Sequence, residues 1–70
     1  MNHDRLIEKL IARLEDTDPA TRRNAAGALR LHGPRAVSAI PALTKLLDDE
    51  NPPVRKEAQR ALARLRLVAA

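Results

Sequence analysis

The feature that most constrains this chain is an internal repeat with a period of 33 residues. Shifting the sequence by that period brings nine identical pairs into one register. The pairs are Ile7 and Ile40, Leu10 and Leu43, Leu14 and Leu47, Asp16 and Asp49, Pro19 and Pro52, Arg22 and Arg55, Ala25 and Ala58, Ala28 and Ala61, and Leu29 and Leu62. Repeated units stack because one unit cannot bury its apolar face alone. The sequence therefore predicts a single domain, residues 1–70, built from two repeats, residues 3–31 and 34–67.

Within each unit the apolar residues recur at three- and four-residue steps, which is the spacing of a buried helix face. The first halves contain Ile7, Leu10, Ile11 and Leu14, and then Ile40, Leu43 and Leu47. The second halves contain Ala25, Ala28 and Leu29, and then Val54, Ala58, Ala61, Leu62 and Leu65. Each unit is thus expected to be a pair of amphipathic helices.

Capping residues mark the start of the second helix in each unit. Asp18 precedes Pro19, and Asn51 precedes Pro52. Each pair places a side-chain acceptor at the N-cap and a proline at the first helical position, where the missing N–H is not needed. From these signals we expect helices at about residues 3–15, 19–31, 38–48 and 53–67.

The connection between the units is less regular. Gly33 followed by Pro34 ends the first unit, because Gly accepts a positive φ and Pro cannot continue a helix. Pro41 is tolerated in the third helix if Ser38 is the N-cap, since the first turn has no intrahelical acceptors for its N–H groups. The alternative is a kinked helix that begins near Pro34.

Composition narrows both the fold and the function. The 70 residues include no Phe, Tyr, Trp or Cys, so the core must be built from aliphatic residues, and thiolate sites and disulfides are excluded. Because this set favours helices over strands, we predict an all-α fold, and the internal repeat predicts four main helices arranged as two stacked antiparallel helix hairpins. The chain has no bilayer-length apolar run and no signal-peptide pattern, so we expect a cytoplasmic protein.

The second unit carries the pattern of a known repeat family. The matching residues are Ile40-Pro41-Ala42-Leu43, Leu46-Leu47-Asp48-Asp49, Pro52, Val54-Arg55, Ala58 and Ala61-Leu62. This pattern resembles a HEAT repeat, and the first unit resembles it more loosely, with Thr21-Arg22 in place of Val54-Arg55. The period of 33 is shorter than the family's usual length of about forty.

The resemblance implies an α-solenoid fragment. The first helix of each unit would lie on the convex side and the second on the concave side, where such proteins usually bind their partners. It also implies that Asp16, Arg22, Asp49 and Arg55 form a ladder linking neighbouring units. In a second interpretation, Arg22 and Arg55 contact a ligand.

The remaining polar residues do not indicate catalysis or a cofactor. The acidic turns, Glu15, Asp16 and Asp18, and Asp48, Asp49 and Glu50, lack the alternation and glycine of an EF-hand, and capping and the helix dipole explain them. No residues have the spacing of metal ligands or the context of a catalytic triad. We therefore expect a protein that is not an enzyme, with no metal, no cofactor and no small-molecule substrate.

Basic residues mark a candidate binding surface on the second helices. Lys56, Arg60 and Arg64 recur at four-residue steps, and the equivalent helix of the first unit carries Arg23 and Arg30. Together they would form a positive strip on the concave side, able to meet phosphates or an acidic protein segment. Alternatively these are solvated side chains whose stems cover apolar surface.

These observations favour a protein–protein interaction module that also self-associates as a homodimer. Two units are fewer than repeat stacks usually need, and apolar residues near both ends are candidates for the self-association surface: Leu6, Ile11, Leu65, Leu67 and Val68. A nucleic-acid-binding module that uses the basic strip is an alternative, although no aromatic residue is present to stack on bases. A designed or excised minimal solenoid without a partner is the third possibility.

Overall fold

The computed structural model describes residues 2–69, with side chains described from Arg5 to Ala69. Its elements are α1 (Asn2–Arg13), α2 (Pro19–His32), a 3₁₀ helix η1 (Gly33–Ala39), α3 (Ile40–Lys45), a short 3₁₀ helix η2 (Leu46–Asp48) and α4 (Pro52–Ala69). No strand occurs between residues 2 and 69. The predicted all-α fold is therefore confirmed over the described chain.

The second helix of each unit begins where the capping residues predict. The Asp18 carboxylate accepts hydrogen bonds from Ala20 N at 3.1 Å and from the Thr21 hydroxyl at 3.2 Å. Asn51 Oδ1 accepts one from Val54 N at 3.2 Å. These bonds satisfy N–H groups that have no partner inside the helix, so α2 and α4 start at the two prolines.

The third helix differs from the expected span of residues 38–48. Gly33 adopts a φ of 61° and ends α2, and the chain continues directly as η1, α3 and η2. Ser38 is not an N-cap, because the cap of α3 is Ala39, which makes no side-chain hydrogen bond. Pro34 and Pro41 supply no backbone N–H. The expectation of four main helices is thus corrected to three long α-helices and one composite segment.

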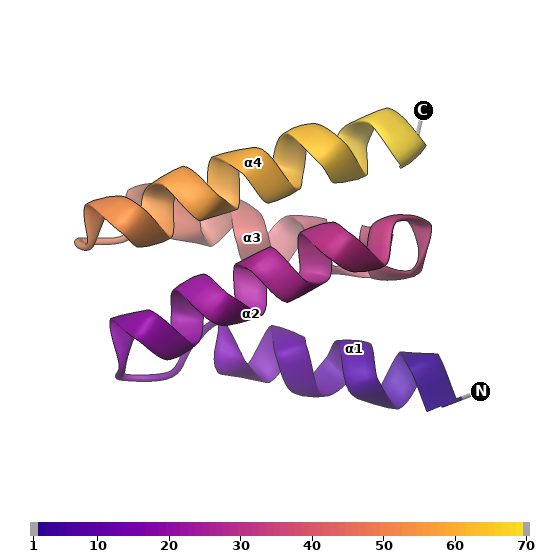
Figure 1. The fold of residues 1–70 in the computed structure, drawn as a ribbon, viewed down its shortest axis with the longest axis horizontal. Coiled ribbons are helices and arrows are strands. Elements are labelled where there is room, and N and C mark those ends of the chain that lie inside the picture. Colours follow the sequence, from indigo (N-terminus) through magenta and orange to yellow (C-terminus); the bar gives the residue numbers. More distant parts are fainter. Residues whose placement is uncertain (1, 70) are drawn as a thin grey trace.

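Figure 1 shows how these elements lie. α2 and α4 run side by side in the same direction, and α1 runs beside α2 in the opposite direction. The contact between α2 and α4 is the most extensive of any pair of elements, and α3 packs against α4. The α2–α4 contact therefore joins the two halves of the chain.

The core lies between these elements and is made of small and branched aliphatic residues. Its members are Ile7, Leu10, Leu14, Ala25, Ala26, Leu29, Ala36, Ala39, Leu43, Leu46, Val54, Ala58, Ala61, Leu62 and Leu65. Ala26 and Ala58 have no exposed surface, and their small size lets α2 and α4 approach closely. No helix within residues 2–69 has the length and hydropathy to cross a membrane.

Candidate functional site

A largely buried ion pair connects the two units. Arg22 Nε lies 2.9 Å from Asp49 Oδ1, although this N–H is not aligned for a hydrogen bond, and Arg22 Nη2 donates to Asp49 Oδ2 at 3.1 Å. Arg22 Nη1 also donates to the carbonyl oxygens of Asp16 at 2.7 Å and Thr17 at 3.1 Å. The exposed fractions of the Arg22 and Asp49 side chains are only 11% and 9%. Arg22 therefore ties the turn before its own helix to the turn before α4.

The surroundings of Asp49 favour its ionised form. Burial acts to raise the pKa of this carboxyl, because the charged form is desolvated. The hydrogen bonds from Asn51 N and Arg22, and the positive charges of Arg22 and Arg55, act in the opposite direction. Their sum holds the pKa of Asp49 below its ordinary value, so Asp49 is a carboxylate at neutral pH.

Arg55 and Asp16 repeat parts of this arrangement at the other two ladder positions. Arg55 Nη1 donates to the carbonyl oxygen of Asp49 at 2.6 Å, as Arg22 does to that of Asp16. Asp16 Oδ1 accepts from Asp18 N at 2.8 Å, as Asp49 Oδ2 accepts from Asn51 N at 2.9 Å. Among the described side chains, neither Arg55 nor Asp16 makes an ion pair.

The acidic turns gather around the buried ion pair. A surface hollow is lined by Glu15, Asp16, Asp48, Asp49 and Glu50, together with Leu14, Thr17, Arg22 and Leu46. Asp18 lies outside this hollow and caps α2. Within the described residues, no group of three or more carboxylates or histidines has the arrangement of a metal site.

The basic strip is mostly exposed, but its members are not equivalent. Arg23, Lys56, Arg60 and Arg64 are exposed, whereas Arg30 is half-buried and its Nε is buried without an acceptor. Arg60 Nη1 lies 3.8 Å from Glu57 Oε1, one turn earlier on α4. The strip therefore offers four exposed cations, one of which has an acidic neighbour.

Glu57 also belongs to this surface, although the predicted basic strip did not include it. Its side chain is 19% exposed, and a Cβ at Gly27 would lie 3.0 Å from Glu57 Oε2. Glu57 thus occupies space on α2 that Gly27 leaves open, and it places a negative charge within the basic strip. The (i, i+3) spacing of Glu57 and Arg60 was the available signal.

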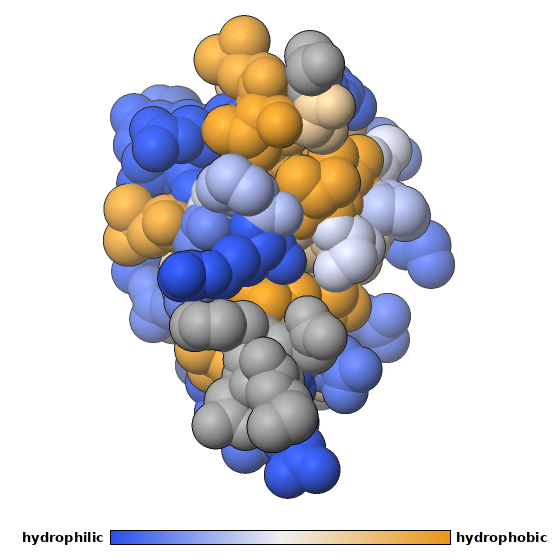
Figure 2. Space-filling view, turned by 90° about the vertical axis from the view of Figure 1, so that its right-hand side faces the viewer, coloured by the Kyte–Doolittle hydropathy of each residue, from blue (hydrophilic) through white to orange (hydrophobic). Residues whose placement is uncertain are grey.

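The candidate self-association residues lie in different environments. Leu6, Leu67 and Val68 are exposed by 42%, 77% and 40%, while Ile11 is half-buried against the core. Leu65 has no exposed surface because it packs inside the chain, which corrects its assignment to an intermolecular surface. Figure 2 views the molecule from the side that lies at the right in Figure 1. Apolar residues gather at the top of this view, where α4 ends.

Another exposed apolar residue was missed, because Leu31 falls outside the helical apolar stripe. Leu31 is 77% exposed and stands near the end of α2, at the position equivalent to Arg64 on α4. Leu31 is therefore an exposed apolar side chain at the repeat position that a member of the basic strip occupies on α4.

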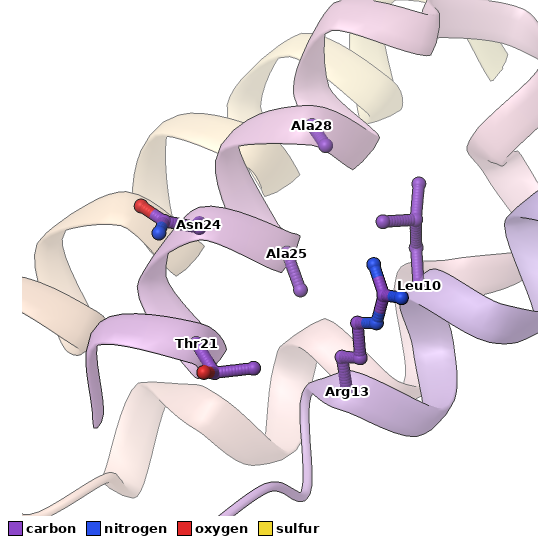
Figure 3. A pocket seen from close by; sticks show the side chains of 6 residues that line it. All are labelled: Leu10, Arg13, Thr21, Asn24, Ala25 and Ala28. Carbon is purple, nitrogen blue, oxygen red and sulfur yellow. The ribbon is translucent and has the colours of Figure 1, made fainter. Parts of the chain in front are cut away.

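A hollow of about 450 Å³ lies between α1 and α2. Its lining residues are Leu10, Arg13, Thr21, Asn24, Ala25 and Ala28. Figure 3 shows Ala25 and Ala28 on α2 across the hollow from Leu10 and Arg13 on α1. Leu10 and the two alanines are its apolar lining residues, and the other three are polar.

Comparison with known proteins identifies the repeat. A family model described as HEAT repeats matches residues 7–70, which include most of the first unit and all of the second. No curated protein and no solved structure matches the chain.

Proposed function

Because the chain belongs to the HEAT-repeat family, we propose that it is a non-catalytic protein-binding module. In this proposal, residues 3–31 and 34–67 form two stacked helix hairpins that present the exposed side of α2 and α4 to a partner. HEAT repeats generally mediate protein–protein interaction, and this general role supports the proposal.

One observation on this chain carries the proposal further. Leu31 and Leu67 are each 77% exposed. Exposed Arg64 lies one turn before Leu67 on α4, at the repeat position that Leu31 occupies on α2. Arg is enriched among the residues that contribute most to binding at protein interfaces, and the exposed apolar side chains beside it add surface that a partner can bury. The partner surface that fits is an acidic segment that also carries apolar side chains.

Self-association is the second part of the proposal. Leu6, Val68 and Leu67 expose apolar surface that a second copy would cover, with Ile11 at the edge of the core. In the proposed stack these residues expose apolar surface near its two outer faces, and repeat stacks need their outer apolar faces covered. A homodimer, or a longer assembly, provides that cover.

The test is affinity capture with matched variants. Immobilised wild-type chain is compared with Arg60→Glu/Arg64→Glu and with Leu31→Gln/Leu67→Gln in an extract of the source organism. A partner held by this surface is lost with both variants. The control is Lys9→Glu/Lys45→Glu, which makes the same change in net charge at exposed residues of α1 and α3. Equal capture by all four proteins would contradict the proposed surface.

Nucleic-acid binding is the alternative, and the exposed cations of the strip are the observation in its favour. Glu57 within the strip and the absence of aromatic residues weigh against it. Salt dependence separates the two functions, because binding through several phosphate contacts weakens steeply as salt rises. Retention of the partner at physiological salt, after nuclease treatment of the extract, supports the protein-binding module.

A further inference from the structure

Arg55 and Asp16 are the repeat equivalents of Arg22 and Asp49, and neither makes an ion pair among the described side chains. Arg22 of the first unit reaches Asp49 of the second. By the same register, Arg55 of the second unit faces the position where a third unit would begin. Asp16 of the first unit faces the position where a preceding unit would end. One end therefore presents a guanidinium and the other a carboxylate.

Both groups are already held in the conformation that the internal pair uses. The hydrogen bond from Arg55 Nη1 to the Asp49 carbonyl fixes the guanidinium beside the turn, as the equivalent bond does for Arg22. The hydrogen bond from Asp18 N fixes the Asp16 carboxylate, as Asn51 N fixes that of Asp49. Groups that are fixed before binding lose less conformational entropy when they pair.

The surface next to Asp16 retains the apolar residues of an internal contact. We call the face that carries Leu6, Leu10, Ala25 and Ala28 the head face. Leu6 is 42% exposed and Ala28 is half-buried, whereas Leu10 and Ala25 are buried. The residues 33 positions later are Ala39, Leu43, Ala58 and Ala61, and all four have no exposed surface. Ala58 and Ala61 lie on α4, which packs against α2 of the first unit, whereas their equivalents Ala25 and Ala28 line the hollow of Figure 3 together with Leu10.

The surface next to Arg55 is a poorer copy of the surface that α2 presents to α4. Its residues Gln59 and Arg60 replace Ala26 and Gly27 of the first unit, and both are exposed. We call this the tail face. Long side chains in place of small ones hold a neighbouring helix further away, although exposed Gln and Arg side chains can turn aside. An assembly through this face is therefore weaker than the contact inside the chain.

From these observations we propose that copies of the chain associate head to tail, with Arg55 of one copy paired to Asp16 of a second copy. The proposal rests on the self-association in the proposed function and specifies its geometry. A head-to-tail contact uses two different surfaces, so it leaves one head and one tail free and allows further copies to add. A two-fold dimer, in contrast, uses one surface on both copies and stops at two.

Two conservative variants test this geometry by sedimentation velocity over a range of concentrations. Asp16→Asn keeps an acceptor for Asp18 N and removes the head charge. Arg55→Met keeps an apolar stem of similar length and removes the tail charge. Wild type is expected to grow in mass with concentration, and each variant alone is expected to associate at least about tenfold more weakly, as when one partner of an interfacial charge pair is removed.

The decisive sample is an equimolar mixture of the two variants. The Asp16→Asn chain retains Arg55, and the Arg55→Met chain retains Asp16, so one intact contact can form between them and none can extend it. The mixture should give a one-to-one dimer that neither variant gives alone. A mixture that associates no better than the separate variants would overturn the head-to-tail geometry, as would a wild type that stops at a dimer.

A third variant keeps the test decisive if the first two lose stability. Gln59→Ala/Arg60→Ala makes the tail face resemble the small-residue face of α2 and replaces both residues with a strong helix former. Association should become stronger, and unchanged or weaker association of the folded protein, judged by circular dichroism, would contradict the assigned tail face. Capture of a protein partner through Leu31 and Arg64 is measured separately, so failure of this inference leaves that part of the proposed function standing.

Discussion

Substitution of Asp49 by Asn removes the charge of the buried ion pair while keeping the size of the side chain. The variant leaves Arg22 as a cation with an 11% exposed side chain and no carboxylate partner. Breaking a buried pair from one side typically costs about 3–5 kcal/mol. Arg22 keeps its bonds to the carbonyl oxygens of Asp16 and Thr17, so we expect the loss at the lower end, about 3 kcal/mol.

Asp16→Asn is the matched control for this experiment. Asp16 precedes α2 as Asp49 precedes α4, and each accepts a hydrogen bond from the backbone N two residues later. The effects on the turn and on the helix dipole are therefore similar in the two variants. Asp16 is exposed and lacks the guanidinium, so its substitution should cost about 0.5 kcal/mol. The difference between the two losses isolates the Arg22–Asp49 pair.

The measurement is urea unfolding followed by circular dichroism, at concentrations where the protein sediments as a monomer. A domain of this size rarely has more than about 3–5 kcal/mol of stability, so Asp49→Asn should be close to unfolded in water. Adding the osmolyte TMAO to all samples raises the stability of the folded state and makes the midpoints measurable. Equal losses for the two variants would refute the reasoning, because the pair would then contribute nothing beyond the turn.

Three further predictions concern single positions. Gly27→Ala should stabilise the protein by about 0.5–1 kcal/mol through helix propensity, because the new Cβ meets only the flexible end of Glu57; a lower melting temperature would show that Glu57 cannot yield. Gly33→Ala should destabilise it by about 1–3 kcal/mol, since a φ of 61° strains other residues, and an unchanged melting temperature would contradict this cause. The pKa of Asp49 is below its ordinary value of 3.8 in the folded state, so its contribution to stability is present above that pH and is lost as the pH falls through the lowered value. Urea unfolding between about pH 5 and pH 3 should therefore show a smaller fall in stability for Asp49→Asn than for wild type.

The sequence was sufficient to locate the helices whose ends are set by local chemistry. Asp18, Asn51 and Gly33 act through hydrogen bonds or backbone angles within a few residues, so their effects can be predicted without knowledge of the fold. The bounds of the composite third segment could not be predicted in the same way. Ser38 has the right chemistry for a cap, but Pro34 and Pro41 and the packing of Ala36 and Ala39 against the core outweigh it.

The surface was harder to predict because it depends on contacts between units. The sequence prediction places Leu65 both in the apolar stripe of the last helix and, with Leu67, in a self-association surface; in the structure Leu65 is buried and Leu67 is 77% exposed. Likewise, Gly27 and Glu57 are 30 residues apart, and no local pattern indicates that one makes room for the other. Asp49 and Arg22 could be recognised as ladder positions through the family resemblance, whereas their distances and burial required the structure.

The composite third segment also has a consequence for how the molecule opens. Two prolines and 3₁₀ geometry give it fewer and weaker backbone hydrogen bonds than α2 or α4. Segments of this kind undergo local unfolding at a lower free energy than the rest of a domain. Amide hydrogens between Gly33 and Asp48 should therefore exchange with solvent before those in the middle of α2 and α4. The connection that α4 covers is then less protected than the paired α2 and α4, which stay folded as the cooperative centre of the described chain.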